Sequence, residues 1–480
     1  MSDIEIFIST SPGETRLALT RNGILHELVI GRDIDQHQTG NIYLGRVEKV
    51  MTGLNAAFVQ IGERNSGFLA APDGQIFDRD REKPKPINAL FKEGDKVLLQ
   101  ATRDEEGDKG AKLTTRLSLV GRNLVLTPDR SGISVSKSVS DDVEKERLKT
   151  AVIDAVSGDA GLIVRTRAQN VDAKILIAEG QILNDAWIDM QASLKTMNAP
   201  ALLHEAPGPI LGFINAKIGK ENWRRILVND RSMIDQIREL GGGKTSDSED
   251  LLVLHAGQED IFDSYDLNQQ IDNALSNVVP LKSGGEIIIE ETAALTAIDV
   301  NSGGGNRRGD AEGWALSVNR EAAQEAGRQI LLRNLSGQIV IDFLPMDKRE
   351  SKDEVAGVLQ QALASDRSAS NVFGFTRLGL LEMTRRRQGK SLTQRLLAQN
   401  EHGKSAETVA LEAIRLALQQ LENDPGRRIK ISAGASVYEA YQRIVAQAWA
   451  IAEKQSGGMI ALEQGTSTAP MDCLVTAMEN

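Results

Sequence analysis

One segment, residues 284–346, constrains the fold most strongly because it predicts a strand, a helix and a second strand in direct succession. Its β-rich first part ends at Asp299, and a glycine-rich loop then leads to Asp310, which is suited to cap a helix. The run 338–344 is apolar up to Asp342, which is typical of a strand covered on both faces. Strands joined in this way lie parallel, with a crossover that is nearly always right-handed. The segment therefore predicts the centre of an α/β sheet.

The two aspartates of this segment are expected at the same edge of the sheet, where α/β proteins bind ligands. Side chains alternate along a strand, so Asn301 shares a face with Asp299. Two carboxylates beside an amide suit Mg²⁺, which prefers oxygen ligands and completes its shell with water and a substrate phosphate. Each aspartate taken singly is more often a turn former or a helix cap than a ligand. As a pair, Asp299 and Asp342 predict a metal site for phosphodiester chemistry, because one cation would compensate both charges.

Three motifs in this part of the chain agree with one known family. They closely resemble the catalytic core of the bacterial ribonuclease E/G family, and they are Leu295-Thr-Ala-Ile-Asp-Val-Asn-Ser302, Val340-Ile-Asp-Phe343 and Arg377-Leu-Gly-Leu-Leu-Glu-Met-Thr-Arg-Arg386. The resemblance implies an endoribonuclease that hydrolyses single-stranded RNA with Mg²⁺, for which Mn²⁺ can substitute. It assigns metal binding to Asp299 and Asp342, and a supporting catalytic role to Asn301. It also implies that mRNA and rRNA precursors are cut at AU-rich sites in RNA processing and decay, leaving 3′-hydroxyl and 5′-phosphate ends.

Length and composition limit the class of protein. A chain of 480 residues is too long for one core and predicts three or four modules. No apolar run approaches the ~20 residues that span a bilayer, and the start, Met1-Ser-Asp-Ile-Glu5, lacks the basic residues of a signal peptide. The single Cys473 excludes an intramolecular disulfide and a cysteine-cluster zinc site. We therefore expect a cytoplasmic protein without a membrane span.

The net charge of −11 argues mildly against nucleic acid binding, because affinity for a polyanion comes largely from neutralised phosphates. A local basic cluster, which follows the second aspartate in the sequence, opposes this argument. It consists of Arg377, Arg385, Arg386, Arg387 and Lys390. A solvated helix end explains such a cluster equally well. Its expected position beside the aspartates favours RNA contacts, which we assign to Arg377 and Arg385.

Short β runs with turns between residues 40 and 119 predict a small barrel. Phe58 and Phe68 fall in such runs, and Lys109 and Lys112 follow. A phenylalanine in a β run usually belongs to the core. Aromatic and basic side chains on a barrel face are, however, how OB-folds stack bases and follow phosphates. The segment resembles the family's S1-like RNA-binding module, which makes these four residues candidate RNA contacts.

The resemblance also divides the rest of the chain. It implies an RNase H-like subdomain from residues 1–39 and 215–278, into which the S1-like OB barrel (40–119) and a 5′-sensor subdomain (120–214) are inserted. A DNase I-like catalytic subdomain (279–400) and a small C-terminal domain (401–480) follow. The fold class expected is therefore multidomain α/β and α+β.

In the sensor segment, a β run ends in Arg165-Thr166. A guanidinium and a hydroxyl at a strand end can hold a terminal phosphate, although Arg165 alone would be read as an exposed arginine. The match with the family's sensor assigns binding of a 5′-monophosphate to both residues.

The C-terminal domain departs from the family's pattern. The Cys-Pro-x-Cys pair that shares zinc between subunits in the family is absent between Arg387 and Thr408. We therefore expect no zinc, and a homo-oligomer, preferably a dimer, that forms without metal. Two rival functions remain open from the sequence: a non-catalytic RNA-binding or assembly protein on the same scaffold, and a phosphodiesterase directed at DNA.

Overall fold

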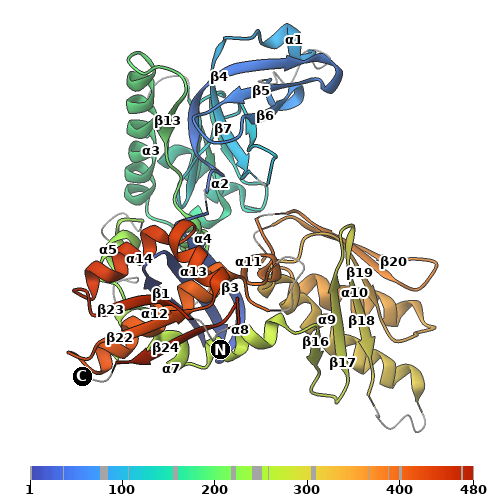
Figure 1. The fold of residues 1–480 in the computed structure, drawn as a ribbon. Coiled ribbons are helices and arrows are strands. Elements are labelled where there is room, and N and C mark those ends of the chain that lie inside the picture. Colours follow the sequence, from blue (N-terminus) through green and yellow to red (C-terminus); the bar gives the residue numbers. More distant parts are fainter. Residues whose placement is uncertain are drawn as a thin grey trace. The chain divides into compact units, whose positions relative to one another are not determined.

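The computed structural model describes residues 3–35, 37–75, 85–105, 107–153, 155, 160–217, 223–240, 251–257, 259–303, 310–366, 368–387, 389–398, 403–465 and 469–478. The chain folds into two compact units (Figure 1). The first contains residues 1–34, 223–231 and 251–480, and the second contains residues 35–222 and 232–250. Both mix helices with sheets, which confirms the multidomain α/β class.

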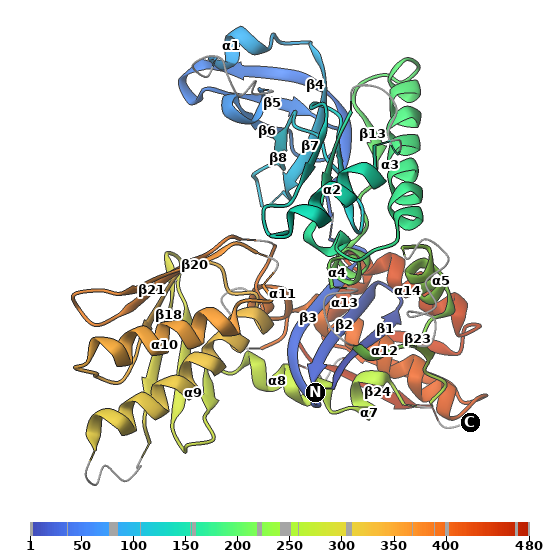
Figure 2. The same cartoon turned by 180° about the vertical axis from the view of Figure 1, so that it is seen from behind.

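The first unit begins with an antiparallel meander. Its strands are β1 (Ile4–Ser11), β2 (Glu14–Arg21) and β3 (Ile24–Arg32). After the second unit the chain returns, and β14 (Trp223–Val228) pairs in parallel with β1 and with β15 (Leu252–Leu254). Two short helices, α7 (Ile261–Ser264) and α8 (Leu267–Leu275), contribute Phe262 and Leu267 to the core beneath this sheet (Figure 2).

A second sheet of the first unit carries the predicted strand, helix and strand. Its six strands are, in spatial order, β16 (Val278–Pro280), β17 (Glu286–Glu291), β18 (Leu295–Asn301), β19 (Gly337–Asp342), β21 (Leu381–Arg385) and β20 (Ser370–Phe375). Strands β18 and β19 are parallel and are joined by α9 (Ala311–Leu332), which confirms the predicted crossover. Asp310 caps α9 as predicted, because its carboxylate accepts a hydrogen bond from the Gly313 backbone N–H. Residues 304–309 of the predicted glycine-rich loop lie outside the described residues.

This sheet is covered on one face, so the prediction that strand 338–344 is covered on both faces was wrong. Ile339 and Ile341 are fully buried in one core with α9 and α10 (Arg349–Ala362), whereas Gln338 and Asp342 are exposed. The apolar run suggested burial of both faces because Val340, which lies on the open face and is only half-buried, is also apolar. The open face is therefore available to a ligand.

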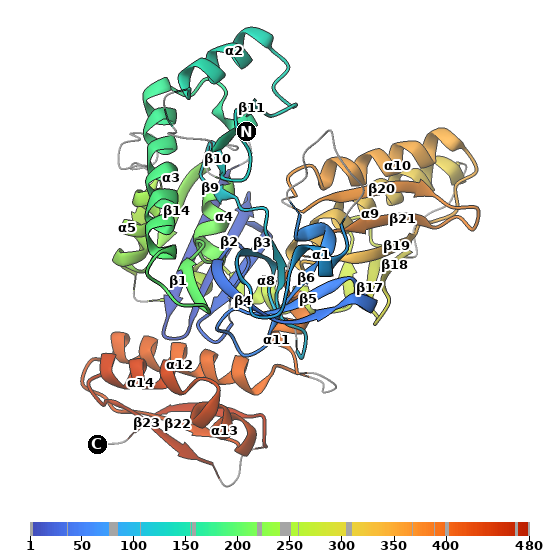
Figure 3. The same cartoon turned by 90° about the horizontal axis from the view of Figure 1, so that it is seen from above.

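The first unit ends in a small α/β module. Its sheet has the order β23 (Ile460–Gln464), β22 (Ile429–Ala433) and β24 (Cys473–Ala477). Helices pack against this sheet (Figure 3); they are α12 (Ala406–Asn423), α13 (Ala435–Arg443) and α14 (Ala446–Gln455). A short helix, α11 (Leu392–Leu396), precedes the module and starts with a capping box at Ser391.

The second unit contains a closed barrel, consistent with an OB-like fold. Its five strands are β4 (Ile42–Met51), β5 (Ala56–Gln60), β6 (Gly67–Ala70), β8 (Lys112–Thr114) and β7 (Lys96–Arg103), and pairing of β4 with β7 closes the ring. The strand β13 (Ala201–His204) pairs with β4 and extends this sheet. Short helical turns lie in the loops of the barrel: η1 (Thr52–Leu54), η2 (Ala71–Asp73) and α1 (Ile87–Leu90).

A second sheet in this unit has the order β11 (Ile133–Val135), β12 (Gly161–Val164), β10 (Leu124–Thr127) and β9 (Leu119–Val120). Two helices belong to the same part of the chain, α2 (Asp142–Ala151) and α3 (Ala173–Leu194). The turn η3 (Thr166–Ala168) follows β12, and the helices α4 (Pro209–Lys217) and α5 (Arg231–Leu240) come later in the chain. The names and boundaries of the five subdomains stay predictions.

Candidate active site

Asp299 and Asp342 lie side by side on neighbouring parallel strands. They are register partners at the ends of β18 and β19, which places their Cα atoms about 4.8 Å apart. Their side chains leave the same face of the sheet, the one that α9 and α10 do not cover, and both are exposed. The structure thus brings the two predicted residues together at one sheet edge.

Alternation along β18 explains how the chain presents these groups. Thr296, Ile298 and Val300 are buried on the helix side, and the residues between them face outward. Asn301 is the last residue of the strand and shares the open face with Asp299. Its amide therefore lies on the same face, two residues beyond Asp299 along the strand, as the sequence predicts.

The charges of this pair are not compensated by the described part of the chain. No ion pair joins Asp299 or Asp342 to another described residue, and two like charges side by side on a sheet repel each other. A cation between them would remove this repulsion. Among the described residues no group of three or more His, Cys, Asp and Glu could hold a metal ion. The donor set still fits Mg²⁺, which takes one or two carboxylates and fills its remaining positions with water and substrate oxygens.

Arg377 lies at the same sheet edge as the acidic pair. It is exposed in the loop between β20 and β21, and β21 starts where Leu381 pairs with Ile341, the residue before Asp342. A guanidinium at this position can contact a phosphate close to the carboxylates.

Arg385 has a structural role, so its assignment as an RNA contact is corrected. It is only 6% exposed, and its guanidinium forms a two-pronged ion pair with Asp366 through Nε, at 2.8 Å, and Nη2, at 3.0 Å. Its Nη1 donates to the Leu335 carbonyl oxygen, also at 2.8 Å. Burial alone would raise the pKa of the Asp366 carboxyl, but hydrogen bonds from Arg385 and Ser370, together with the Arg385 charge, outweigh it and lower the pKa. Because the Arg385 guanidinium is buried and paired with Asp366, it is not accessible to a phosphate.

The rest of the basic cluster does not lie beside the aspartates, which corrects a second expectation. Strand β21 runs antiparallel to β19, so Arg385 pairs with Gly337 at the start of β19. That position is about 17 Å along the strand from Asp342. Arg386, Arg387 and Lys390 follow at this far end, where they are exposed. Basic residues that follow Arg377 closely in the sequence thus lie at the opposite end of the strands from the acidic pair.

The candidate RNA contacts on the barrel share its outer surface. Phe58 and Phe68 pair across β5 and β6 with their ring centroids 5.9 Å apart, and Lys112 is the bridge partner of Phe68. The flanking residues Ala57 and Val59 are fully buried, so the half-buried rings face outward rather than into the core. Lys109 is exposed just before β8.

Sequence reasoning missed one member of this surface. Lys49 on β4 is the register partner of Phe58 and is exposed, so two lysines flank two phenylalanines across four strands. One of them, Lys112, also forms an ion pair with Asp73 at 2.9 Å. Period-two alternation from the buried Val47 would have put Lys49 in the interior. A register shift between Val47 and Lys49 turns it outward, and nothing in the sequence identifies this shift or the partner strand.

Arg165 and Thr166 lie at the end of β12 in a cluster of positive charge. Arg165 donates to the Gly121 carbonyl oxygen at 3.0 Å, and the hydroxyl of Thr166 lies 2.9 Å from that of Ser136. Arg122 and Arg167, which the sequence analysis did not single out, stand close by: burial, together with the charges of Arg165 and Arg122, lowers the pKa of Arg167 to about 10. Such a cluster favours an anion.

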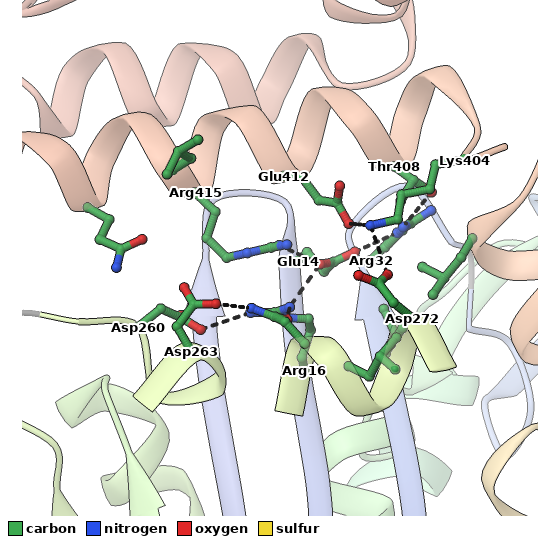
Figure 4. A pocket seen from close by; sticks show the side chains of 16 residues that line it. Glu14, Arg16, Arg32, Asp260, Asp263, Asp272, Lys404, Thr408, Glu412 and Arg415 are labelled. Atoms are coloured by element: carbon green, nitrogen blue, oxygen red, sulfur yellow. Dashed lines mark hydrogen bonds and ion pairs between the residues drawn. The ribbon is translucent and has the colours of Figure 1, made fainter. Parts of the chain in front are cut away.

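A different charged cluster lines a polar pocket of about 240 Å³ elsewhere in the first unit (Figure 4). Glu14, at its centre, is 4% exposed and pairs with Arg32 at 2.7 Å and with Arg415 at 2.8 Å. Arg16 pairs with Asp260 at 3.1 Å, and Lys404 pairs with Glu412 at 2.9 Å. We call this cluster the Glu14 seam; it joins the meander to α12. Because its charges are paired within the chain, it has the character of a structural contact.

An OB-like barrel with an aromatic and basic outer surface, combined with a sheet that pairs two carboxylates at its edge, defines the class of nucleic-acid-processing proteins. In the described part of the chain, no helix is long and apolar enough to cross a membrane.

Comparison with known proteins identifies the family. The model of the Ribonuclease E/G family matches residues 118–388. Ribonuclease G of Haemophilus influenzae is 34% identical over 428 residues, which cover 86% of this chain and 87% of that protein. Ribonuclease G of Escherichia coli K12 is 33% identical over 455 residues, with 91% and 92% covered, and Ribonuclease E of Nostoc sp. is 36% identical over 375 residues, with 77% and 54% covered. The chain belongs to the Ribonuclease E/G family, and this membership indicates an endoribonuclease.

Proposed function

We propose that the protein hydrolyses phosphodiester bonds of single-stranded RNA with Mg²⁺, which Mn²⁺ can replace, held by Asp299 and Asp342. The observation that carries the proposal is the direct register pairing of the two exposed carboxylates on the open face. When bound, the ion supplies polarisation of the phosphodiester, activation of a water molecule and neutralisation of charge on the leaving oxygen.

The chain's own residues position the substrate in this proposal. Asn301 orients the metal ligands or the attacking water from the same face of β18. Arg377 binds a phosphate oxygen at the same edge. The open face itself is where an extended strand of RNA would lie, because α9 and α10 pack on the other face.

The barrel holds a second part of the RNA. Phe58 and Phe68 stack on bases, while Lys109 and Lys112 neutralise phosphates. Their outward direction supports this role, since a core function would require burial.

The arginine cluster around Arg165 and Thr166 binds the 5′-monophosphate of the substrate. An anion there would offset the mutual repulsion that contributes to the lowered pKa of Arg167. The protein consequently prefers RNA ends that carry one phosphate over ends that carry three.

Within this proposal, the biological setting follows the family resemblance. The substrates are mRNA and rRNA precursors in the cytoplasm, cut in AU-rich regions to give 3′-hydroxyl and 5′-phosphate ends. The small C-terminal module supports a dimer that forms without zinc.

The test is cleavage of a 5′-monophosphorylated single-stranded RNA by the full chain, with Mg²⁺ or with EDTA. We expect internal, metal-dependent products from the wild type, no products from Asp299→Asn, and nearly equal RNA binding by both. Glu422→Gln is the matched control, because Glu422 is exposed on α12 in the small C-terminal module, which does not contain the acidic pair. Retention of RNA without cleavage by the wild type would favour a non-catalytic binder, and equal cleavage of the DNA analogue would favour a DNA-directed enzyme.

A further inference from the structure

The edge strand β20 contains a β-bulge that redirects one aromatic side chain. Val372 pairs with the buried Met383 and Phe375 with the buried Leu381, so both face the helices. Residues on the same face of a regular strand are separated by an even number of positions, whereas these two are three apart. The register shift between Val372 and Gly374 supplies the extra residue, Phe373. Bulges of this kind re-aim side chains and are frequent beside active sites.

The bulge gives the two phenylalanines of β20 opposite environments. Phe375 packs in the core, with its ring centroid 5.9 Å from that of the buried Phe343. Phe373 is 67% exposed. Gly374, which follows it, pairs with Glu382 on the open face and has φ of 99°, a conformation that other residues adopt rarely. Phe373 and Gly374 together oppose Glu382, so the phenylalanine ring belongs to the open-face side of the sheet.

This exposed ring lies near the acidic edge. Strand β20 is separated from β19 by β21 alone, which makes it about 10 Å across the sheet from the strand of Asp342. The loop after β20 holds Arg377 and Leu378, and Leu378 is 87% exposed. The hairpin extends outward from the sheet in Figures 1 and 2. An aromatic ring, an aliphatic side chain and a guanidinium are thus gathered on one projecting hairpin.

We propose that Phe373, supported by Leu378, stacks on a nucleobase of single-stranded RNA beside the position of cleavage. The inference rests on the proposed function of Asp299 and Asp342 and adds a residue that selects unpaired bases. A base presents a π-face whatever its identity, and stacking on an aromatic ring does not require a fixed sequence. The same hairpin offers Arg377 to the backbone of that nucleotide. A base-paired strand keeps its bases stacked on one another and cannot present one to the ring, so this contact favours single-stranded substrates.

The occupant is an RNA base rather than a protein surface, because the ring is continuous with the acidic open face and has a cation next to it. Burial of a protein partner here would also cover the acidic edge. A protein partner is therefore the competing outcome of the experiment.

The experiment uses the full chain and a fluorescent 5′-monophosphorylated single-stranded RNA in which single nucleotides are made abasic in turn. Binding is measured by anisotropy in the Asp299→Asn background, and kcat/KM is measured in the active protein. The variants are Phe373→Ala, Phe373→Trp and, as the matched control, Leu474→Ala, which truncates a leucine that is 56% exposed on β24.

We expect Phe373→Ala to weaken RNA binding roughly five- to hundredfold, the range for loss of one stacked base, and to lower kcat/KM in parallel. Phe373→Trp should restore both, and Leu474→Ala should change neither. With the wild type, an RNA that is abasic at one particular position should show the same loss of affinity as Phe373→Ala shows with intact RNA. With Phe373→Ala, the same abasic RNA should bind no more weakly than intact RNA. Unchanged binding in Phe373→Ala, or equal sensitivity of both proteins to every abasic position, overturns the inference and points to a protein partner.

Failure of the proposed function is distinguishable from failure of this inference. If the wild type does not cut RNA, the metal-site proposal fails, while the binding measurements still decide the role of Phe373. If the wild type cuts RNA and Phe373→Ala binds and cuts equally well, only the stacking proposal fails.

Discussion

Two clusters of carboxylates in the same unit differ in how their charge is compensated. In the Glu14 seam, a buried carboxylate has two arginine partners within 2.8 Å, and α12 and the meander hold all of them in place (Figure 4). At the edge of β18 and β19, Asp299 and Asp342 are exposed neighbours with no ion-pair partner among the described residues. The comparison shows that a buried carboxylate needs a counter-charge from the chain itself. An exposed pair of carboxylates can instead be neutralised by a bound ligand.

The largest effect is expected in the seam. Glu14→Ala should destabilise the protein by about 3–5 kcal/mol, because Arg415 would lose its carboxylate partner and the buried Arg32 would keep only its ion pair with Glu407. Denaturant unfolding of the full chain measures this loss. Asp299→Asn is the matched change at the open edge and should not lower the unfolding midpoint, because it removes a repulsion between like charges. A decrease of the midpoint by a similar amount in both variants would contradict the claim that Glu14 has a structural role and Asp299 does not.

The pH dependence of stability sharpens the same contrast. Burial alone would raise the pKa of Glu14, but the charges of Arg415, Arg32 and Arg16 outweigh it and the pKa is lowered from 4.5. A carboxyl with a lower pKa in the folded state stabilises the protein above its unfolded pKa, and this contribution is lost as the pH falls through the folded value. The wild type should therefore lose stability below about pH 4.5 more steeply than Glu14→Gln. Identical slopes in the two proteins would contradict the assignment.

At the open edge, the expected effect is on chemistry. Asp342→Asn should lower the cleavage rate at least about a hundredfold, the scale on which loss of one preorganised electrostatic group acts. Single-turnover cleavage of the RNA measures it, and Glu422→Gln, on α12, should remain at the wild-type rate. A fully active Asp342→Asn variant would remove the metal-site proposal.

Much of the fold was accessible from local patterns, and the acidic pair is the clearest case. Strand alternation, a helix cap at Asp310 and the handedness of crossovers are properties of a short segment, and together they place Asp299 opposite Asp342. The position of Arg385 depends on the antiparallel pairing of β21 with β19, which the sequence around Arg385 does not reveal. Reversal of the chain after Leu378 carries Arg385 to the far edge and buries it against Asp366.

The same limit applies to the other surfaces. Alternation predicts that one side of β5 faces the core, but only the closed ring shows that Phe58 is on the outer side. Glu14 and Arg415 are separated by 401 positions in the chain, so nothing local indicates their contact. A bulge that exposes Phe373 is likewise invisible, since the sequence around it reads as an ordinary β run.

On the barrel, a smaller effect is expected from a single stacking residue. Phe58→Ala should weaken binding of single-stranded RNA by about 1–3 kcal/mol, the contribution of one aromatic platform. Anisotropy titration with a short RNA measures it. Phe91→Ala, a partly buried phenylalanine of the barrel core, separates lost stacking from general loosening of the barrel; equal losses in RNA affinity would assign the effect to folding.

The smallest effect is expected at Lys109. Lys109→Ala should weaken RNA binding uniformly across sequences and reduce the slope of log affinity against log salt by about 0.7, as for one phosphate contact to a single strand. Titration at several salt concentrations determines the slope. A change that depends on RNA sequence would instead indicate a contact with a base.

The most direct test of the acidic pair is Mn²⁺ binding, followed by electron paramagnetic resonance on the full chain without RNA. We predict that the wild type binds Mn²⁺ in competition with Mg²⁺, and that the combined Asp299→Asn and Asp342→Asn variant loses this site while its unfolding midpoint is not lowered. Mn²⁺ binding of equal strength in that folded variant would contradict the central claim.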